Sequence, residues 1–421
     1  MGSLWHGNTA VERLLKLVTN RNLMLMSVAS LLTDIAGEMT YPLLSMLFIG
    51  TLGVSKSFFG LVEGIAESVA QLLRVGAGRL SDAMGKRKPL TIGGYLLGVI
   101  GKLVLGLAAW PAMALTGRVV DRLGKALRSP ARDALIAESV GSSERGRAFG
   151  FHQAMDTAGA FIGVAIAWVM LRSGMKDVQP VFMWAALPAG LAVVLLLFVR
   201  ETGKGRKTTA SDKGSTGGTG AWGGKKARPT WAQAWRAVPA ELKRYLLIVF
   251  LFNVGNCSNQ FLLLRAESRG FSATDVIAAY ALYNLTYTLL AYPAGAIADR
   301  LGHKRVLMAG YLVHGLTYAG FAAAGLAGPW VIWVLFGVYG AHMALTEGVE
   351  KALIVDLAPA ELRATTLGMF STVVGVALLP ASAIAGVMWD RLGPVAPFAV
   401  GGALGVGAAV ALGWGLKRRP Q

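Results

Sequence analysis

One short pattern occurs once in each half of the chain. Residues 78–88 read G-R-L-S-D-A-M-G-K-R-K, and residues 295–305 read G-A-I-A-D-R-L-G-H-K-R. In both copies a glycine ends an apolar run, an aspartate follows four residues later, and a basic cluster precedes the next apolar run. A second similarity relates residues 132–150 to residues 350–368, and the two copies are separated by nearly the same number of residues as the two copies of the first pattern. Long-range repetition in an apolar chain predicts two similar halves embedded in a membrane.

Composition supports a membrane location. The 421 residues are 54% hydrophobic and 15% charged, whereas a soluble protein carries about 25% charged residues. Several apolar runs exceed the ~18 residues needed to cross a bilayer core. The net charge of +18 does not indicate a nucleic-acid partner, because the basic residues gather in short clusters between apolar runs, as the positive-inside rule requires.

Apolar runs between charged or Gly/Pro breaks predict an all-α membrane fold of twelve transmembrane helices in two pseudo-symmetric six-helix bundles. The expected spans are roughly 23–49, 58–81, 90–109, 112–139, 148–171, 180–199, 244–264, 274–298, 304–326, 329–356, 365–389 and 395–416. A Gly-, Lys-, Thr- and Ser-rich stretch predicts a flexible linker. The expected divisions are residues 1–200 for the N-terminal bundle, 201–240 for the linker and 241–421 for the C-terminal bundle.

The distribution of Lys and Arg predicts the orientation. Basic clusters at residues 86–88, 145–147, 304–305 and 417–419, and those of the linker, fall on one side of the membrane if twelve spans are present. Both termini and the linker are therefore expected in the cytoplasm. The expected location is the cell membrane, as a multi-pass protein of a bacterial inner membrane.

The repeated motif resembles the signature of the major facilitator superfamily, G-x-L-x-D-x-x-G-R/K-R/K between spans 2 and 3. It is met by Gly78–Arg87, and Gly295–Arg305 is the second-half copy. The resemblance implies a rocker-switch secondary transporter whose motif residues hold the bundles together on the cytoplasmic side when the site faces outward. The expected gating residues are Asp82, Gly85, Arg87, Asp299, Arg300, Arg132 and Asp156. A partial exporter pattern in span 5, at Gly150, Gly159 and Gly163, favours export.

Ionisable residues inside spans are costly, so each is a functional candidate. Asp34 and Glu38 lie four residues apart and share one helix face, which predicts a proton-coupling site with Arg118 or Arg122 as its ionic partner. Positions 118, 121, 125, 128 and 132 form a single stripe along span 4. Glu63 and Glu67 are expected near the outer end of span 2, where their side chains are exposed to solvent. Acids and bases nearly balance in this half, which indicates paired charges that exchange partners.

The second half offers mostly neutral groups at the corresponding places. Aligning the repeats sets Asn253 and Asn256 opposite Asp34 and Glu38. This contrast predicts that the first bundle carries the coupling charge and the second helps to hold the solute. The expected substrate-binding residues are Arg118, Arg122, Asn253, Asn256, Asn284, Tyr287, Glu347 and Lys351.

The favoured function is proton-coupled efflux of a small solute by alternating access. An enzyme is disfavoured, because the chain has no H-E-x-x-H or G-x-S-x-G motif and only one cysteine. A transition-metal exporter that uses Asp34, Glu38 and His152, and an organic-anion or phosphorylated-metabolite transporter, stay open, and a uniporter or channel is less favoured. The expected partners are a small molecule or ion, protons and the lipid bilayer, and the expected state is a monomer with no cofactor and no resident metal.

Overall fold

Each apolar run that the sequence predicts to be a span is helical over most of its length in the computed structural model. The structure describes residues 19–84, 87–141, 145–175, 177–201, 235–359 and 362–415. The first half contains α2 (Arg21–Thr40), the 3₁₀ turn η1 (Tyr41–Leu43), the π-helical turn η2 (Met46–Thr51), α3 (Lys56–Met84), α4 (Lys88–Gly106), α5 (Pro111–Ser139), α6 (Arg145–Arg172) and α7 (Gln179–Leu197). The second half contains α9 (Ala240–Gly255), α10 (Gln260–Ser268), α11 (Ala273–Leu301), α12 (His303–Ala323), η4 (Ala324–Leu326), α13 (Trp330–Leu357), α14 (Arg363–Leu392) and α15 (Ala396–Gly415). No strand occurs among these described residues, so the all-α prediction is confirmed.

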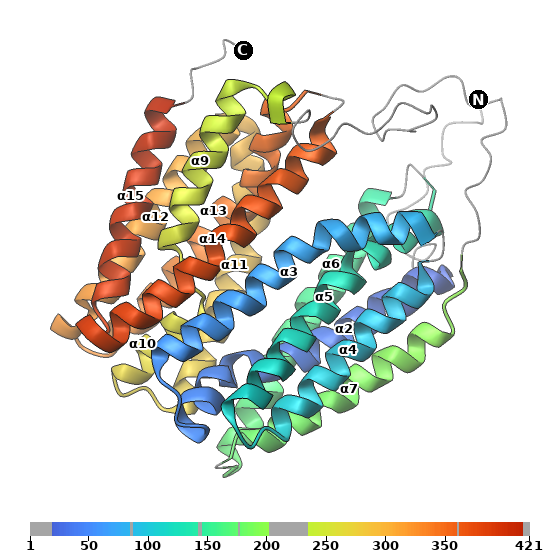
Figure 1. The fold of residues 1–421 in the computed structure, drawn as a ribbon, viewed down its shortest axis with the longest axis horizontal. Coiled ribbons are helices and arrows are strands. Elements are labelled where there is room, and N and C mark those ends of the chain that lie inside the picture. Colours follow the sequence, from blue (N-terminus) through green and yellow to red (C-terminus); the bar gives the residue numbers. More distant parts are fainter. Residues whose placement is uncertain are drawn as a thin grey trace, which may run out of the picture.

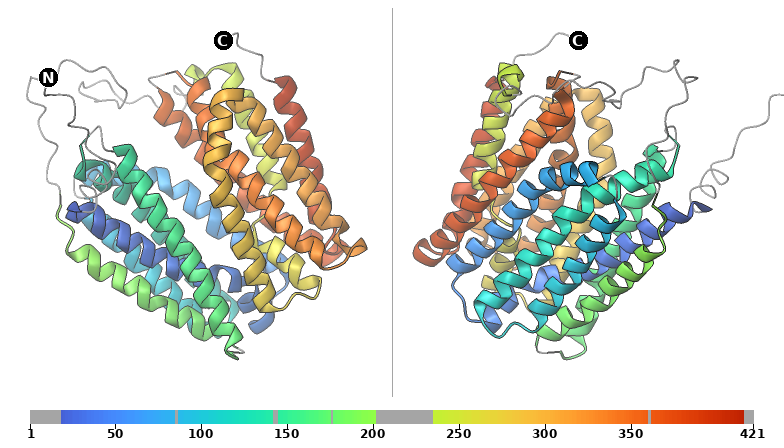
Figure 2. Two further views of the ribbon diagram at one scale, coloured as in Figure 1. Left: turned by 180° about the vertical axis from the view of Figure 1, so that it is seen from behind. Right: turned by 45° about the vertical axis from the view of Figure 1, so that its right-hand side comes forward.

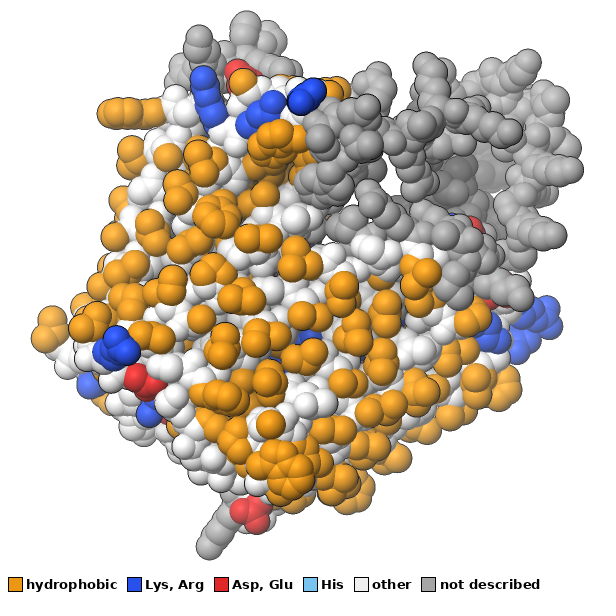
Figure 3. Space-filling view, viewed as in Figure 1, with side chains coloured by type: hydrophobic (Ala, Val, Ile, Leu, Met, Phe, Trp, Pro, Cys, Tyr) orange, Lys and Arg blue, Asp and Glu red, His pale blue; other side chains and the backbone are white. Residues whose placement is uncertain are grey.

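Length and hydropathy agree with a membrane location. Nine stretches of helix in the described part of the chain are long and apolar enough to cross a membrane. Helices α3, α5 and α11 fall outside that set, so the count of twelve crossings stays a prediction. Large apolar side chains such as Leu191, Leu289 and Leu316 are exposed on the outside of the helices. Figure 3 shows such side chains spread over the surface of both halves, as lipid contact requires.

The seventh expected span is not continuous. The prediction of one helix over 244–264 was wrong, because the chain unwinds at 256–259, between α9 and α10. Asn and Ser side chains compete with the helical backbone for hydrogen bonds, and here they bind neighbouring helices instead. The Tyr318 hydroxyl donates to Asn256 Oδ1 at 3.2 Å, and the Tyr339 hydroxyl donates to Asn259 Oδ1 at 2.8 Å. This unwound turn, residues 256–259, faces the first half.

The two halves of the chain form two groups of helices that meet at one end and diverge at the other. Helices α2–α7 lie on one side and α9–α15 on the other (Figures 1 and 2). Between the groups, α3 packs along α14 and α6 packs against α11. The groups diverge toward the end where the described chain begins and ends (Figure 2). The assignment of residues 1–200, 201–240 and 241–421 to bundle, linker and bundle stays a prediction, since most of the linker lies outside the described residues.

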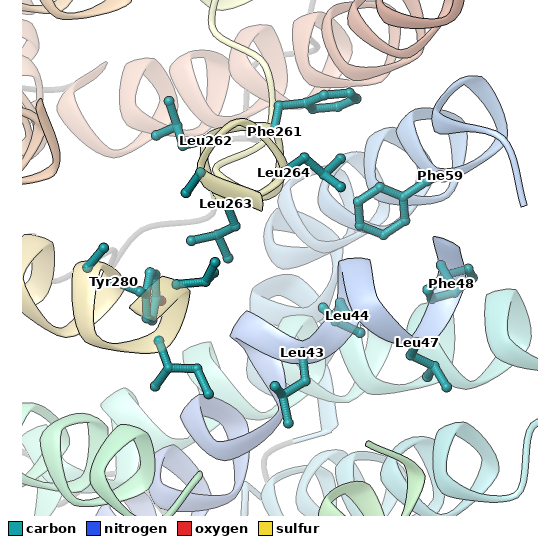
Figure 4. Close-up of a cluster of buried hydrophobic side chains, with 14 of the residues drawn as sticks. Leu43, Leu44, Leu47, Phe48, Phe59, Phe261, Leu262, Leu263, Leu264 and Tyr280 are labelled. Atoms are coloured by element: carbon teal, nitrogen blue, oxygen red, sulfur yellow. The ribbon is translucent and has the colours of Figure 1, made fainter. Parts of the chain in front are cut away.

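Close helix approach and an apolar cluster hold the meeting end together. A Cβ atom added at Gly60 of α3 would collide with the backbone oxygen of Ser382 in α14. Beside this crossing, the rings of Phe59 and Phe261 lie 6.5 Å apart, and those of Phe261 and Trp389 lie 6.0 Å apart. Figure 4 shows Phe59 and Phe261 in one apolar cluster with leucines of η1, η2 and α10. Aromatic pairs at such distances add to the apolar packing, so this end is sealed by residues of both halves.

Candidate functional site

A cavity of about 300 Å³ lies between the two halves, and its wall is charged on one side only. The first half contributes Thr33, Asp34, Gly37, Glu38, Tyr41, Glu67, Lys102, Asp121, Arg122, Lys125 and Arg128. The second half contributes Asn256, Cys257, Ser258, Asn259, Tyr280 and Leu378. Four acids and four bases therefore face the cavity from α2, α3, α4 and α5, while the opposite wall offers amides, hydroxyls and a thiol.

The stripe predicted along α5 supplies three of those eight charges, and Arg122 beside it supplies a fourth. Asp121, Lys125 and Arg128 line the cavity together with Arg122. The Lys102 ammonium of α4 donates to Asp121 at 2.8 Å. Glycines allow α4 to approach α5 closely enough for this contact, since a Cβ at Gly101 would lie 2.7 Å from the Asp121 backbone nitrogen. Helical periodicity thus predicted three of the cavity-facing positions of α5, while Arg118 and Arg132 of the same stripe lie outside the lining.

Arg118 has a different partner from the one that the sequence suggested. Its guanidinium donates to both oxygens of Glu63, from Nε at 2.8 Å and from Nη2 at 3.0 Å. Glu63 is fully buried and Arg118 is 2% exposed, so the expectation of a solvated Glu63 was wrong. A bidentate pair of this kind is strong and directional. It joins α3 to α5, and Glu67 adds a third contact at 3.4 Å.

Glu63 also contacts the second half of the molecule. The Ser258 hydroxyl, in the unwound turn 256–259, donates to Glu63 Oε2 at 3.1 Å. A single carboxylate therefore binds an arginine of its own half and a hydroxyl of the other half. Because the pair is buried, losing either contact would leave a polar group without a partner.

The acids predicted to bind protons lie in the cavity wall, and one of them reaches across to the other half. The Tyr280 hydroxyl of α11 donates to Glu38 Oε2 at 2.9 Å. Neither Asp34 nor Glu38 forms an ion pair among the described residues. The predicted exchange with Arg118 or Arg122 is therefore absent in this arrangement, where Arg122 lies 3.4 Å from Glu67.

The second-half residues predicted to bind substrate are mostly elsewhere. Asn256 lines the cavity, but the buried amide of Asn253 donates to the Val249 oxygen of its own helix at 2.9 Å. Asn284 likewise donates to the Tyr280 oxygen at 3.1 Å. Tyr287 and Glu347 bind each other at 2.7 Å, away from the cavity lining. The exposed Lys351 also lies outside that lining.

The predicted gating residues are spread over the diverging end. Gly85 and the Asp82 side chain lie outside the described residues. Arg87 pairs with Glu138 at 3.0 Å, and Arg132 lies 3.9 Å from Asp156. Asp299 contacts His303 at 3.5 Å and Arg300 is exposed. Arg132, Asp156 and Asp299 thus contact residues of their own half, where the two halves have separated.

His152 does not join Asp34 and Glu38. Its ring lies 3.4 Å from the Ser27 hydroxyl and 3.6 Å from Asp156, outside the cavity lining. Within the described ranges, no three His, Cys, Asp or Glu side chains are grouped so that they could hold a metal ion. The three residues named for a metal exporter are therefore not brought together.

Sequence reasoning missed three residues that line the cavity, Tyr41, Ser258 and Tyr280, and it named Glu63 but expected it in solvent. Tyr41 lines the cavity, and its ring lies 5.7 Å from the Arg118 guanidinium carbon. An aromatic or a serine within an apolar run carries no distinguishing signal. The pairing of Glu63 with Arg118 carries no local signal either, because it depends on how α3 packs against α5.

Comparison with known proteins agrees with this fold. The family model of the Major Facilitator Superfamily matches residues 26–264 and 246–421. A protein of Methanocaldococcus jannaschii, named an uncharacterized MFS-type transporter, is 34% identical over 393 residues, which cover 92% of this chain and 93% of that protein. Multidrug resistance protein MdtH of Salmonella paratyphi C is 25% identical over 395 residues, 90% of this chain and 91% of that protein.

Solved structures share the architecture. The nucleoside transporter NupG, in its D323A form, superposes with a TM-score of 0.77 at 14% identity, over 94% of this chain and all of that one. A POT family transporter solved with 5-aminolevulinic acid gives 0.74 at 13% identity, over 93% of this chain and 95% of the other. These likenesses concern the fold alone. Together with the family match, they establish that this chain belongs to the major facilitator superfamily and is a membrane transporter, not an enzyme.

Proposed function

We propose that the protein exports a small solute in exchange for protons, by alternating access. The observation that carries this proposal is the hydrogen bond from Tyr280 of the second half to Glu38 of the first half. Because an ionised carboxylate accepts a stronger hydrogen bond than a protonated one, the protonation state of Glu38 changes the strength of a contact between the halves. A proton and the movement of the halves are thereby linked.

Asp34 completes the proposed coupling site. It lies one helical turn from Glu38 and faces the same cavity, without an ionic partner among the described residues. A carboxylate inside a membrane protein persists when it faces a wet cavity and exchanges a proton or a partner. The pair can take up a proton when the cavity faces outward and release it when the cavity faces the cytoplasm. The solute binds after that release and leaves on the outer side.

Two features support export. The partial exporter pattern at Gly159 and Gly163 places small residues where α6 crosses α2: a Cβ at either position would collide with the backbone oxygen of Leu31 or Ile35. The name multidrug resistance protein, carried by the MdtH relatives, also favours efflux. The proposal has the protein acting as a monomer in the cell membrane, with both chain ends in the cytoplasm and protons moving inward.

Everted membrane vesicles give a direct test. With a pH gradient established by respiration and reported by a fluorescent amine, addition of a transported solute should release protons and restore fluorescence. The double variant Asp34→Asn, Glu38→Gln should lose this release. Each single variant should lower the rate at least tenfold, because the remaining acid lacks its neighbour.

A matched control is Asp177→Asn, which makes the same change at an exposed position before α7. It should behave as the wild type. Undiminished solute-driven proton release by the double amide variant, at equal protein level, would disprove the coupling site.

A further inference from the structure

The charged residues of the cavity divide into those that have ionic partners and those that do not. Lys102 pairs with Asp121 at 2.8 Å, and Arg122 pairs with Glu67 at 3.4 Å. Lys125 and Arg128 of α5 have no carboxylate within ion-pair distance among the described residues. Within the same described ranges, Asp34 of α2 has no basic side chain within ion-pair distance, and Glu38 accepts a hydrogen bond from the Tyr280 hydroxyl. Two bases, Lys125 and Arg128, and two acids, Asp34 and Glu38, thus have no ionic partner among the described residues.

The two bases form one side of the unoccupied space. Arg128 is 8% exposed, and its Nη1 atom has no hydrogen-bond partner in the structure. Its guanidinium lies over the Tyr95 ring at 4.9 Å, which holds the group in place but supplies no acceptor. Lys125 lies three residues earlier, almost one helical turn away, and lines the same cavity. A buried donor without an acceptor favours binding of an anionic group.

The two acids form the other side. Asp34 and Glu38 lie four residues apart on α2, which packs against α5. Lys125 is near enough to Asp34 to act on it electrostatically, but too far to form an ion pair. The acid pair and the base pair therefore line one cavity without pairing with each other among the described residues.

We infer that the transported solute is a zwitterion, with an ammonium group bound by Asp34 and Glu38 and a carboxylate or phosphate bound by Arg128 and Lys125. The inference rests on the proposed function, since it assigns the substrate class of that transporter. A cavity of about 300 Å³ lies at the lower end of the ~300–1,000 Å³ range of small-molecule sites, which suits a small solute such as an amino acid or a dipeptide. A solute with only one charge would leave either the acids or the bases unmatched.

The same arrangement connects binding to the proposed exchange. A solute ammonium that approaches Glu38 competes with the Tyr280 hydroxyl for the carboxylate. It also favours the ionised form of both acids, so solute binding and proton release occur together. A neutral or purely anionic solute provides no such competition.

Binding to the purified full-length protein tests the inference. The probes are straight-chain ω-amino acids from 3-aminopropanoate to 8-aminooctanoate, and glycyl and alanyl dipeptides. Each is compared with its alkanoate, which lacks the ammonium, and its alkylamine, which lacks the carboxylate. Calorimetry should find at least one zwitterion that binds tenfold or more tightly than both of its single-charge analogues. No saturable binding by any zwitterion, or equal binding by an analogue, overturns the inference.

Variants assign the two ends. Lys125→Gln and Arg128→Gln should each weaken zwitterion binding at least tenfold and leave the weak alkylamine binding unchanged, whereas Asp34→Asn should weaken zwitterion and alkylamine alike. Lys125→Arg keeps the charge and should retain binding, which separates a lost contact from a misfolded protein. Equal losses for zwitterion and alkylamine in Lys125→Gln would count against the assignment.

Selective zwitterion binding without proton release in vesicles would overturn the proposed function alone, and proton release driven only by single-charge solutes would overturn this inference alone.

Discussion

Helix α2 in the first half and the segment α9–α10 in the second occupy matching places in the sequence repeat, but they present different chemistry to the cavity. Helix α2 runs unbroken past Asp34 and Glu38. Its counterpart unwinds at residues 256–259 and presents amide, thiol and hydroxyl groups. Duplication preserved the helix order, while the polar groups diverged. The comparison teaches that two carboxylates can line the cavity from an intact helix, whereas the uncharged groups of the second half line it from an unwound turn.

Energetics differ between the two walls as well. In the first half, charge is stabilised by charge, as in the Arg118–Glu63 pair. In the second half, hydroxyls and amides bind each other, as in the contacts of Tyr318 and Tyr339 with the unwound turn 256–259. Removing one member of a buried ion pair costs more than removing a neutral hydrogen bond. Substitutions in the two walls should therefore differ in size.

The largest effect is expected at Glu63. Glu63→Gln removes the charge that balances the buried Arg118 most closely and leaves Glu67 at 3.4 Å and Asp121 at 4.0 Å. The free energy of unfolding should fall by about 3 kcal/mol, at the lower end of the 3–5 kcal/mol typical of a broken buried pair. Ser258→Ala, which removes the neutral partner of the same carboxylate, should cost about 1 kcal/mol. Unfolding in mixed micelles measures the change in free energy for both variants. Equal decreases in Glu63→Gln and Ser258→Ala would show that charged and neutral contacts contribute equally to stability.

The next effect concerns the contact between the halves. Gly60→Ala places a methyl group against the Ser382 backbone of α14, so the sealed end should open and the population of the opposite conformation should rise. Gly93→Ala of α4, where a Cβ meets nothing within 4 Å, is the matched control. Accessibility of a cysteine introduced at position 59 reports the opening. An unchanged labelling rate in Gly60→Ala would show that this crossing does not seal the end.

The smallest effect is expected within the second half. Asn256 lines the cavity while Asn253 binds its own helix. Asn256→Ala should weaken solute binding by about two- to tenfold, the value of one hydrogen bond of about 0.5–1.5 kcal/mol, and Asn253→Ala should leave it unchanged. Calorimetry with the same solute compares the two. A larger loss of binding in Asn253→Ala than in Asn256→Ala would show that the solute binds nearer to Asn253 than to the unwound turn.

The sequence predicted the periodic features better than the paired ones. The shared face of Asp34 and Glu38, and the stripe through Asp121, Lys125 and Arg128, follow from helical spacing and do line the cavity. The pairing of Arg118 with Glu63 could not be predicted, because it depends on how far α3 slides along α5 in the fold. The residues around Glu63 in the sequence do not show how deep in the membrane it lies, so its side chain was expected in solvent.

The break in the seventh span was missed for a related reason. Residues 244–264 are apolar enough to cross a membrane as one helix, and isolated Asn or Ser residues do not by themselves end a helix. Unwinding at residues 256–259 is stabilised by hydroxyl donors on α12 and α13. Tyr280 was missed likewise, because its role depends on contact with the other half.

The most direct test of coupling between acid protonation and movement is a pair of distance measurements by spin labelling in lipid nanodiscs. One pair joins positions 198 and 301 at the diverging end, and the other joins positions 107 and 392 at the sealed end, all of them exposed. Between pH 8 and pH 5 the two distances should change in opposite directions in the wild type, and neither should change in the Asp34→Asn, Glu38→Gln variant. Equal pH-dependent changes in that variant, or no change in the wild type, would contradict the account.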